Sequence, residues 1–357
     1  MPVDAGKLPD AQLLDGRSRD GGATAVAHPN IALVKYWGKR DERLVLPYTD
    51  SLSMTLDVFP TTTSVRLSPG ATTDEVTLNG VLAEGEAGRR ITAFLDLVRE
   101  RAGRAERAVV CTSNTVPTGA GLASSASGFA ALAVASAAAY GLRLDATGLS
   151  RLARRGSGSA SRSIFGGFAV WRAGTDAGTD TDRDAETVMD LASHAEPVPV
   201  GDLAPALVIA LLDTGPKAVS SREAMRRTVE TSPLYRAWAA SSRADLVEMR
   251  EALRHGDLAA VGEVAERNAL GMHATMLAAR PAVRYLSPTS VTVLDTVLRL
   301  RRDGVPAYAT IDAGPNVKVL CRSSDADQVS AAVRAAASCP VAVAHCGPGA
   351  RLQTGDR

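Results

Sequence analysis

The sequence predicts an α+β fold with two domains, and three observations carry that prediction. The chain has 357 residues, more than one hydrophobic core usually supports. Several β-branched, alternating segments precede the first long helical pattern, which favours α+β over a doubly wound sheet. A Gly/Ser-rich string, PTGAGLASSASG at 117–128, follows a predicted strand and precedes a predicted helix. We therefore expect an N-terminal α+β domain built around this string and a second αβ domain after it.

Residues 1–23 are predicted to form a disordered tail, because they are polar, rich in Gly and Asp, and lack periodicity. Structure is expected to begin near Thr24. The segment ATAVAHPNIALVKYWGKR alternates as a strand and ends in a turn at Gly38. LPYTDSLSMTLDVF, TTTSVRL and TDEVTLNG follow as further strands. The residues from Arg89 to Ala102 then show the apolar spacing of an amphipathic helix.

The Gly/Ser-rich string lies between a strand predicted over 108–112 and an Ala-rich helix predicted over 127–140. Gly119 and Gly121 let backbone amides approach a ligand closely, and the first turn of a helix presents free N–H groups to an anion. Three hydroxyls are available for phosphate or Mg²⁺: Ser124, Ser125 and Ser127. The string matches neither the P-loop nor the dinucleotide-binding pattern. A Ser/Gly turn that caps a structural helix remains an open alternative.

The next segment is predicted to contain a helix at 149–155, a Gly/Ser turn and a strand at 168–171. A basic cluster faces this turn: Arg154, Arg155 and Arg162. Planar guanidinium groups suit carboxylate and phosphate recognition better than ammonium groups do. Residues 173–184 are predicted to form a disordered surface loop.

A second domain is predicted to open with the buried strand in APALVIALLDTG. Helical patterns follow at 221–228, 233–254, 258–279 and 290–303. VPAYATIDAGPNVKVLC then predicts strand, turn and strand, before a helix at 325–337 and a strand at 340–344. These patterns place an N-terminal domain at 24–203, a C-terminal domain at 204–350 and a tail at 351–357.

Asp312 ends an apolar strand at a turn that contains Gly314. An aspartate in this position commonly caps the turn, although a catalytic base would also stand at such a strand end. The sequence leaves both interpretations open.

Three cations stand close together in the first strand region: Lys35, Lys39 and Arg40. We interpret Arg40, which precedes Asp41, as part of a solvated strand edge. Lys39 follows Gly38 directly and is interpreted as the cation that faces an anion.

Composition excludes several classes of protein. Lys and Arg number 40 against 39 Asp and Glu, so no overall charge favours nucleic acid or an acidic membrane. Neither a run of eighteen apolar residues nor a signal peptide is present. The four cysteines are scattered, as expected of reduced thiols in a cytoplasmic protein. The adjacent His345 and Cys346 do not by themselves make a metal site.

Several strings, in this order, resemble the GHMP small-molecule kinase superfamily, whose phosphate loop has the form PxxxGLxSSA. Within it the resemblance is to the mevalonate diphosphate decarboxylase family. It extends from about residue 24 to 343 and rests on HPNIALVKYWGKRDERLVLP (28–47), PTGAGLASSASGFAAL (117–132), ARRGSGSASRSIFGGFAVW (153–171), HAT (273–275) and IDAGPN (311–316).

The resemblance implies ATP-dependent decarboxylation of (R)-5-diphosphomevalonate to isopentenyl diphosphate, ADP, phosphate and CO₂, in the mevalonate pathway of isoprenoid biosynthesis. It implies an N-terminal GHMP-type domain with the phosphate loop, a ferredoxin-like C-terminal domain and a site between them. ATP and Mg²⁺ are the implied cofactors. The implied protein is a cytoplasmic homodimer that binds a small-molecule substrate and neither nucleic acid nor membrane.

The resemblance also implies site residues. Asp312 would contact or deprotonate the 3-hydroxyl, Arg162 would bind the carboxylate, and Lys39 and Ser221 would complete the catalytic set. The implied substrate contacts are Tyr36, Trp37, Gly38, Lys39, Arg89, Ser157, Gly158, Ser159, Ala160, Ser161 and Arg162. The implied ATP contacts are Pro117, Gly119, Gly121, Leu122, Ala123, Ser124 and Ser125, with Ser124 as the candidate Mg²⁺ ligand.

The chain departs from the family pattern at Ala224, where glycine is frequent, at Thr49-Asp50 before SLS, and at Ser161, where cysteine is frequent. Two alternatives remain: a mevalonate or phosphomevalonate kinase that stops at the phosphorylated product, and a non-catalytic nucleotide-binding relative. KYWGKRD together with DAGPN argues against the kinase. The presence of Asp312, Lys39 and Arg162 argues against the non-catalytic relative. Preference between mono- and diphosphate substrates is left open.

Overall fold

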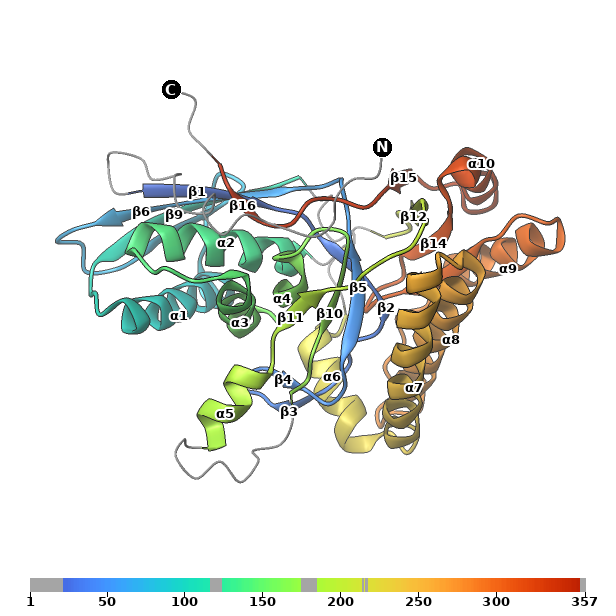
Figure 1. The fold of residues 1–357 in the computed structure, drawn as a ribbon, viewed down its shortest axis with the longest axis horizontal. Coiled ribbons are helices and arrows are strands. Elements are labelled where there is room, and N and C mark those ends of the chain that lie inside the picture. The colour runs from blue at the N-terminus through green and yellow to red at the C-terminus, as the bar shows by residue number, and fades with distance from the viewer. Residues whose placement is uncertain (1–21, 116–123, 175–184, 214, 216–217, 354–357) are drawn as a thin grey trace.

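Three main β-sheets with their helices form the architecture of the chain (Figure 1). The computed structural model describes residues 22–115, 124–174, 185–213, 215 and 218–353. The N-terminal strands are β1 (Gly22–Ala27), β2 (Asn30–Val34), β3 (Lys39–Asp41), β4 (Leu46–Pro47), β5 (Ser51–Thr55), β6 (Thr61–Ser68), β7 (Glu75–Leu78), β8 (Val81–Leu82), β9 (Arg107–Asn114), β10 (Phe168–Trp171) and β11 (Ala195–Pro197). The helices of this half are α1 (Gly85–Ala102), α2 (Ser124–Tyr140), α3 (Ala146–Gly156), α4 (Ala160–Ser163) and α5 (Ala185–Ala192).

The largest sheet has the strand order β16-β1-β6-β9-β7-β8, and α2 packs against its strands β1 and β6. In Figure 1 this sheet lies above α1, α2 and α3, so the helices cover one of its faces. The helix α2 is rich in alanine, and most of its residues are buried. Small side chains let the helix lie close to the sheet and to its neighbouring helices at once, because little volume separates the backbones.

A four-stranded sheet with the order β11-β10-β5-β2 stands between the two halves of the chain. Every residue of β2 is buried, because both of its faces are covered. Ile31 and Leu33 belong to the same hydrophobic cluster as Leu207 and Leu246 of the C-terminal half. The two halves therefore share a core.

The C-terminal half carries a third sheet with the order β13-β14-β12-β15, antiparallel throughout. Along the chain, this half runs strand, helices, strand, strand, helix, strand. That chain order, combined with the strand order in the sheet, is the ferredoxin-like topology. The strands of this half are β12 (Pro205–Ala210), β13 (Tyr308–Ile311), β14 (Val317–Arg322), β15 (Val341–Ala344) and β16 (Arg351–Leu352). The helices are α6 (Ser221–Thr231), α7 (Tyr235–His255), α8 (Leu258–Leu277), α9 (Pro288–Arg302), the 3₁₀ turn η2 (Ser323–Asp325) and α10 (Ala326–Ala337).

The predicted α+β fold with a ferredoxin-like C-terminal part is confirmed, with corrections at both ends of the described chain. Gly22 and Ala23, assigned to a tail, pair with β6 as the first residues of β1. Arg351–Leu352, assigned to the other tail, forms β16, which pairs with β1 and closes the edge of the N-terminal sheet. The prediction for 1–23 rested on polar composition, whereas backbone pairing needs no apolar side chain.

Other local predictions differ in detail. The long first strand is two strands, β1 and β2, separated at His28 and Pro29. The predicted turn before β10 contains the short helix α4, and α5 was not predicted. The predicted disordered loop at 173–184 lies almost entirely outside the described residues, as does most of the Gly/Ser-rich string.

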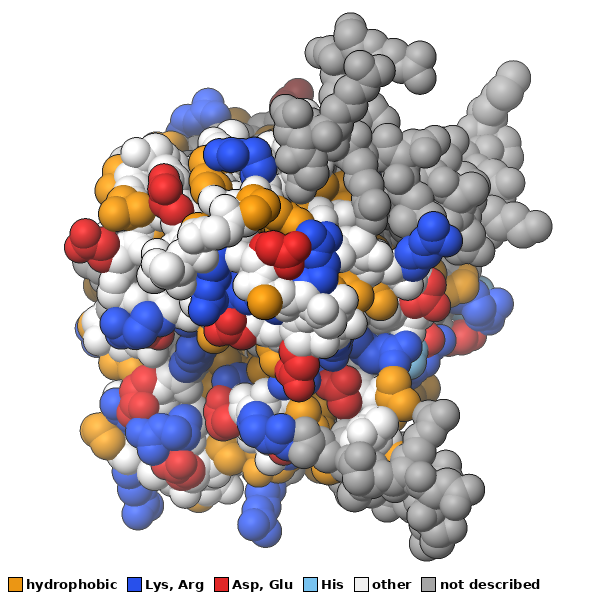
Figure 2. All heavy atoms as spheres, turned by 90° about the vertical axis from the view of Figure 1, so that its left-hand side faces the viewer, with side chains coloured by type: hydrophobic (Ala, Val, Ile, Leu, Met, Phe, Trp, Pro, Cys, Tyr) orange, Lys and Arg blue, Asp and Glu red, His pale blue; other side chains and the backbone are white. Residues whose placement is uncertain are grey.

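The described surface mixes charges of both signs. Figure 2 shows Lys and Arg side chains interspersed with Asp and Glu over one face, in agreement with the near-zero net charge. Within the described ranges, none of the helices combines the length and the apolar character needed to cross a bilayer.

Candidate active site

Asp312 is the centre of the site and stands immediately after β13. Its Oδ1 atom accepts a hydrogen bond from Lys35 Nζ at 2.7 Å, and its Oδ2 atom forms an ion pair with Lys318 Nζ at 3.2 Å. The two lysine side chains are 2% and 1% exposed, whereas the aspartate retains 23%. The carboxylate is thus held from inside the protein, with Oδ2 buried and the rest of the side chain partly exposed.

The turn after β13 does not use the Asp312 side chain as its cap. The amide of Gly314 donates to the backbone carbonyl of Asp312 at 2.9 Å, and the carboxylate is engaged by the lysines. Of the two interpretations of this residue, the structure therefore favours the charged site residue over the turn cap.

Lys35 follows β2 and is fixed in place by the surrounding backbone. Its Nζ also donates to the Ala32 carbonyl at 2.7 Å, and its amide donates to Asn268 Oδ1 at 2.8 Å. Burial lowers the pKa of Lys35 to about 8, against the opposing effect of Asp312. Its charge is therefore sensitive to pH within the range in which an enzyme works.

Arg162, on α4, supplies a third buried cation whose acceptors are neutral oxygens. Its guanidinium donates to the hydroxyls of Ser51 and Ser53 and to Asn30 Oδ1. The Cζ atom lies 5.9 Å from the centre of the Trp171 ring. Burial lowers the pKa of Arg162 to about 10. The group is held in one orientation and keeps its charge at neutral pH, as recognition of a carboxylate requires.

The segment Tyr36-Trp37-Gly38 joins the two halves beside this centre. Gly38 has φ +95°, and a Cβ there would lie 2.1 Å from the hydroxyl oxygen of Tyr235. That hydroxyl donates to the Trp37 carbonyl at 2.9 Å. Among the described atoms, the Tyr36 hydroxyl and the Trp37 indole N–H are buried and have no hydrogen-bond partner. Buried polar groups are rarely left so, which makes both atoms candidates to bind a ligand.

The Gly/Ser segment before α4 packs against the same aromatic side chains. A Cβ on Gly158 would lie 2.7 Å from Trp171 and 2.9 Å from Tyr36, so the close approach requires glycine. Ser161 and Ala160 are buried, and the Ser161 hydroxyl donates to the Gly158 carbonyl at 2.8 Å. The Ser157 and Ser159 hydroxyls lie 3.4 Å apart, within reach of a ligand.

The predicted phosphate-binding end of α2 is adjacent to this segment. Ser157 Oγ donates to Ser125 Oγ at 3.3 Å, and Ser124 and Ser125 are exposed as the first residues of α2. Ser127 is instead buried and bonded to Thr61, so its hydroxyl serves the fold. The remaining predicted ATP contacts lie outside the described residues: Pro117, Gly119, Gly121, Leu122 and Ala123.

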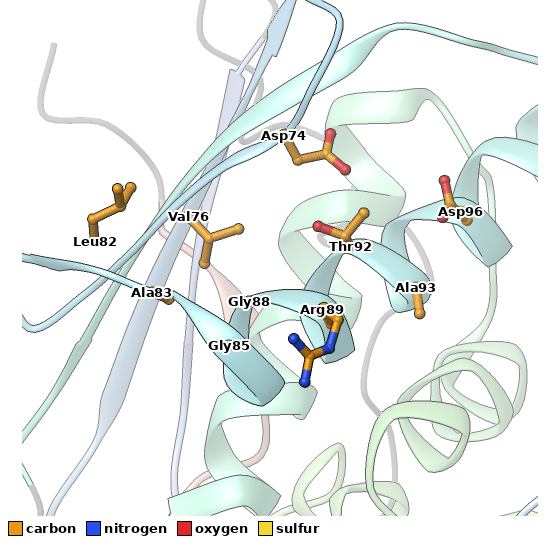
Figure 3. Close-up of a pocket in the computed structure, with 10 residues that line it drawn as sticks. All are labelled: Asp74, Val76, Leu82, Ala83, Gly85, Gly88, Arg89, Thr92, Ala93 and Asp96. Carbon is orange, nitrogen blue, oxygen red and sulfur yellow. The ribbon is translucent and has the colours of Figure 1, made fainter.

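Three predicted residues are not brought to Asp312. Lys39 forms an ion pair with Glu42. Ser221 is the first residue of α6 and hydrogen-bonds with the side chain of Tyr285. Arg89 lines a separate cavity of about 430 Å³ between the β7–β8 hairpin and α1 (Figure 3).

The next residue along α1 points to the site instead. Arg90 donates to the Gly156 carbonyl at 3.2 Å and lies 5.1 Å from the centre of the Phe129 ring. Successive helical residues are about 100° apart around the axis, so Arg89 and Arg90 face different surroundings. Burial and the nearby charge of Arg222 lower the pKa of Arg90, so the two guanidinium groups lie near each other.

Sequence reasoning assigned no role in the site to four residues: Lys35, Lys318, His273 and Arg90. Burial, together with the charge on Lys35, lowers the pKa of His273 to about 4, so it is neutral at pH 7. A usable signal existed for the lysines, since each stands in an apolar run, where a charge must be paired. Nothing in the sequence indicated that Arg90, rather than Arg89, faces the site.

The departure at Ala224 is readily accommodated. Ala224 lies within the first turn of α6, its amide donates to the Ser220 carbonyl at 2.9 Å, and its side chain is fully buried. Alanine is favoured over glycine in such a helix by about 0.5–1 kcal/mol. In the described part of the chain, no group of three or more His, Cys, Asp and Glu side chains could hold a metal ion.

Fold and site together define a two-domain α+β enzyme with a buried, positively charged site for an anionic small molecule. Residues 27–184 match the model of the diphosphomevalonate decarboxylase-like N-terminal domain, and 207–347 match that of the mevalonate 5-diphosphate decarboxylase C-terminal domain. The chain belongs to the diphosphomevalonate decarboxylase family.

Individual relatives agree with this assignment. The diphosphomevalonate decarboxylase of Homo sapiens is 38% identical over 87% of this chain and 79% of its own length. The phosphomevalonate decarboxylase of Haloferax volcanii is 34% identical over 87% of this chain and 91% of its own. A solved structure of MDDEF in complex with MVAPP, AMPPCP and magnesium is 43% identical, with a TM-score of 0.86, over 93% of this chain and 99% of that one.

Proposed function

We propose that the protein catalyses the ATP- and Mg²⁺-dependent decarboxylation of (R)-5-diphosphomevalonate to isopentenyl diphosphate, ADP, phosphate and CO₂. The observation that carries the proposal is the partly exposed Asp312 side chain, held between two buried ammonium groups beside Arg162. Membership of the decarboxylase family gives this arrangement its substrate.

The proposed chemistry uses these charges in order. Asp312 would accept a hydrogen bond from the tertiary 3-hydroxyl and orient its oxygen to attack the γ-phosphate of ATP. The bond from the γ-phosphorus to the bridging oxygen would break to release ADP, and the hydroxyl proton would leave to a phosphate oxygen and then to solvent. Arg162 binds the substrate carboxylate. A hydroxyl is a poor leaving group, whereas the phosphate ester leaves readily with the electron pair of its C–O bond. The pair released from the C–CO₂ bond then forms the alkene. Positioning and charge stabilisation supply most of the rate enhancement in such reactions.

The remaining predicted contacts keep proposed roles. To them we add Arg90 and Arg222, whose charges lie close enough to interact, as candidates to bind the substrate diphosphate. Ser124 and Ser125, at the exposed start of α2, fit phosphate oxygens, and Ser124 is the candidate Mg²⁺ ligand. Magnesium bound with ATP would neutralise charge on the phosphate oxygens. Lys39 would reach substrate after leaving Glu42, and Arg89 and Ser221 would act at the margin of the site.

We also propose a cytoplasmic homodimer. The four cysteines are free, as is usual in a reducing compartment. Light scattering on the purified protein measures the subunit number directly.

A substrate panel tests the function. Purified protein is incubated with ATP, Mg²⁺ and diphosphomevalonate, phosphomevalonate or mevalonate, and CO₂ release is measured for each. We expect the highest kcat/KM with diphosphomevalonate, because two guanidinium groups match a diphosphate. The Haloferax volcanii relative makes the monophosphate the second candidate substrate. Absence of CO₂ with all three substrates would contradict the proposed function.

A further inference from the structure

Lys318 is a fully buried lysine, the second residue of strand β14. It lies on β14, between β13 and β12, opposite Thr310 on one side and Ile209 on the other. Its side chain is 1% exposed. Burying an ammonium group costs several kcal/mol unless it is paired, and an apolar side chain of similar size would fill this volume without that cost.

The direction of this side chain is set by the register of the sheet. Residues directly opposite each other on neighbouring strands point to the same face, so Lys318 and Thr310 share one. The Thr310 hydroxyl donates to the Ala32 carbonyl of β2 at 3.3 Å. The face therefore meets the N-terminal half, and Lys318 extends along it to Asp312.

Each half of the chain contributes one lysine to Asp312. Lys35, from the N-terminal half, binds Oδ1, and Lys318, from the C-terminal half, stands 3.2 Å from Oδ2. Lys35 is also held by the Ala32 carbonyl, so it does not depend on Asp312 for its position. The carboxylate needs a partner on each oxygen to be fixed against rotation about its Cβ–Cγ bond.

We propose that Lys318 is a positioning residue for the reaction, holding the second oxygen of Asp312 so that the carboxylate presents one fixed orientation to the substrate hydroxyl. The inference rests on the proposed function and adds to it a residue that does not itself contact substrate. Its contact with the site is the ion pair with Asp312.

The charges facing Asp312 from all sides agree with this role. Three are cations: Lys35 after β2, Lys318 on β14 and Arg162 on α4. The fourth titratable neighbour, His273 on α8, is neutral. Burial would raise the pKa of Asp312, but Lys35 and Lys318 lower it well below its usual value. The carboxylate is therefore ionised at neutral pH. As a weak base it contributes by orientation and charge, which depend on how rigidly it is held.

A double-mutant cycle tests the inference, with wild type, Lys318→Met, Asp312→Asn and the double variant assayed on diphosphomevalonate. Lys318→Met should lower kcat by about 10- to 100-fold, the effect of losing one charge-assisted contact, while KM for ATP stays within about threefold. In the Asp312→Asn background, adding Lys318→Met should lower kcat by less than about a further threefold. Lys318→Arg, which keeps the charge, should recover part of the loss.

The pH profile separates positioning from a structural role. Loss of one cation raises the pKa of Asp312, so the acid limb of kcat/KM should move to higher pH in Lys318→Met. Comparison with wild type on the same substrate cancels the titration of the substrate itself. Val319→Ala is the matched control, since this neighbour on β14 packs into the opposite core. It should lower the melting temperature and leave the acid limb in place.

Each outcome bears on the inference. The inference would be overturned if the kcat losses of the two single variants multiplied in the double variant. It would also be overturned if Lys318→Met kept the wild-type kcat and the wild-type acid limb. Lys318→Gln, a shorter neutral donor, gives the same comparison if the Met variant does not fold, as judged by its thermal melt. Wild-type protein that releases no CO₂ overturns the proposed function and this inference together, whereas wild-type activity with an unaffected Lys318 variant overturns this inference alone.

Discussion

At the scale of single residues, the site is defined by its surplus of positive charge. Lys35, Lys318 and Arg162 stand against one carboxylate, and His273 is neutral. Buried charge without full compensation is costly, so the arrangement is suited to an anion that arrives with the substrate. The substrate carboxylate and the phosphates of ATP supply such charge.

Replacement of Asp312 tests this balance directly. Asp312→Asn should lower kcat by at least about 100-fold, because an amide cannot supply the charge. It should also lower the free energy of unfolding by up to about 3 kcal/mol, because two buried ammonium groups lose their partner. Kinetic assays and urea denaturation on the same preparation measure both effects. Asp303→Asn, exposed after α9, is the control for loss of one negative charge. Turnover within a few-fold of wild type would show that Asp312 has no role in the reaction.

The lowered pKa of Lys35 leads us to expect opposite effects of pH on activity and on stability. Its folded pKa of about 8 lies below its ordinary value of 10.5. Between these values the unfolded chain keeps the proton and the folded protein loses it, so the free energy of unfolding contributed by Lys35 rises with pH, by at most about 3 kcal/mol. The activity should instead fall above pH 8, as the ammonium group is lost.

The two effects are measured as kcat/KM and as urea denaturation from pH 7 to 10. In Lys35→Met the part of the stability gain due to this residue should disappear, while other groups continue to titrate. A stability curve for Lys35→Met that parallels wild type throughout this range would contradict the assignment.

The sequence predicted Asp312 and Arg162 and assigned the first cation to Lys39 rather than Lys35. The reason is physical: Lys35 follows β2 and Lys39 begins the three-residue strand β3, so neither lies within an alternating strand that would show its direction, and both side chains are largely buried. Arg90 escaped for a similar reason, since a choice between adjacent helical residues depends on a rotation of the helix that packing sets. Lys318 and Asp312 belong to the same β13–β14 hairpin, and only the register of its two strands places their side chains together.

At the scale of elements, prediction was most successful where one pattern controls one segment. The predicted β10 and most predicted helices agree with the structure to within a few residues. Errors fall on short elements such as α4 and β16, because their formation depends on the elements that pack around them. The connection from β2 to β3 is the element on which the site depends most, since it carries Lys35 at one end and passes Gly38 beneath Tyr235.

Gly38→Ala should therefore impair both stability and catalysis. Its φ of +95° disfavours a side chain by about 1 kcal/mol or more, and the new methyl group would collide with Tyr235 from the other half of the chain. We expect a lower melting temperature and at least about a tenfold loss of kcat/KM. Gly70→Ala is the matched control, because Gly70 also has a positive φ, +83°, but has no atom within 4 Å of the added Cβ. Equal effects of the two substitutions would rule out the contact with Tyr235 as the cause.

At the scale of the whole molecule, the two halves form one catalytic unit. They share a hydrophobic cluster, β16 returns from the C-terminal half to pair with β1, and Asp312 is bound by a lysine from each half. A linear division of the sequence at 203/204 describes the order of the two folds but cannot show this sharing. Long-range pairing and a common core arise after the chain has folded, so sequence patterns within one segment carry no record of them.

The central claim is that phosphorylation and decarboxylation occur in succession in this one site. The most direct measurement is a single-turnover experiment with ATP, Mg²⁺ and diphosphomevalonate labelled in its carboxyl group, in which ADP and labelled CO₂ are quantified at each time point. The account predicts one CO₂ for each ADP when the turnover is complete, with isopentenyl diphosphate as the product. One ADP per site with a stable phosphorylated product and no CO₂ would contradict it and identify the protein as a kinase.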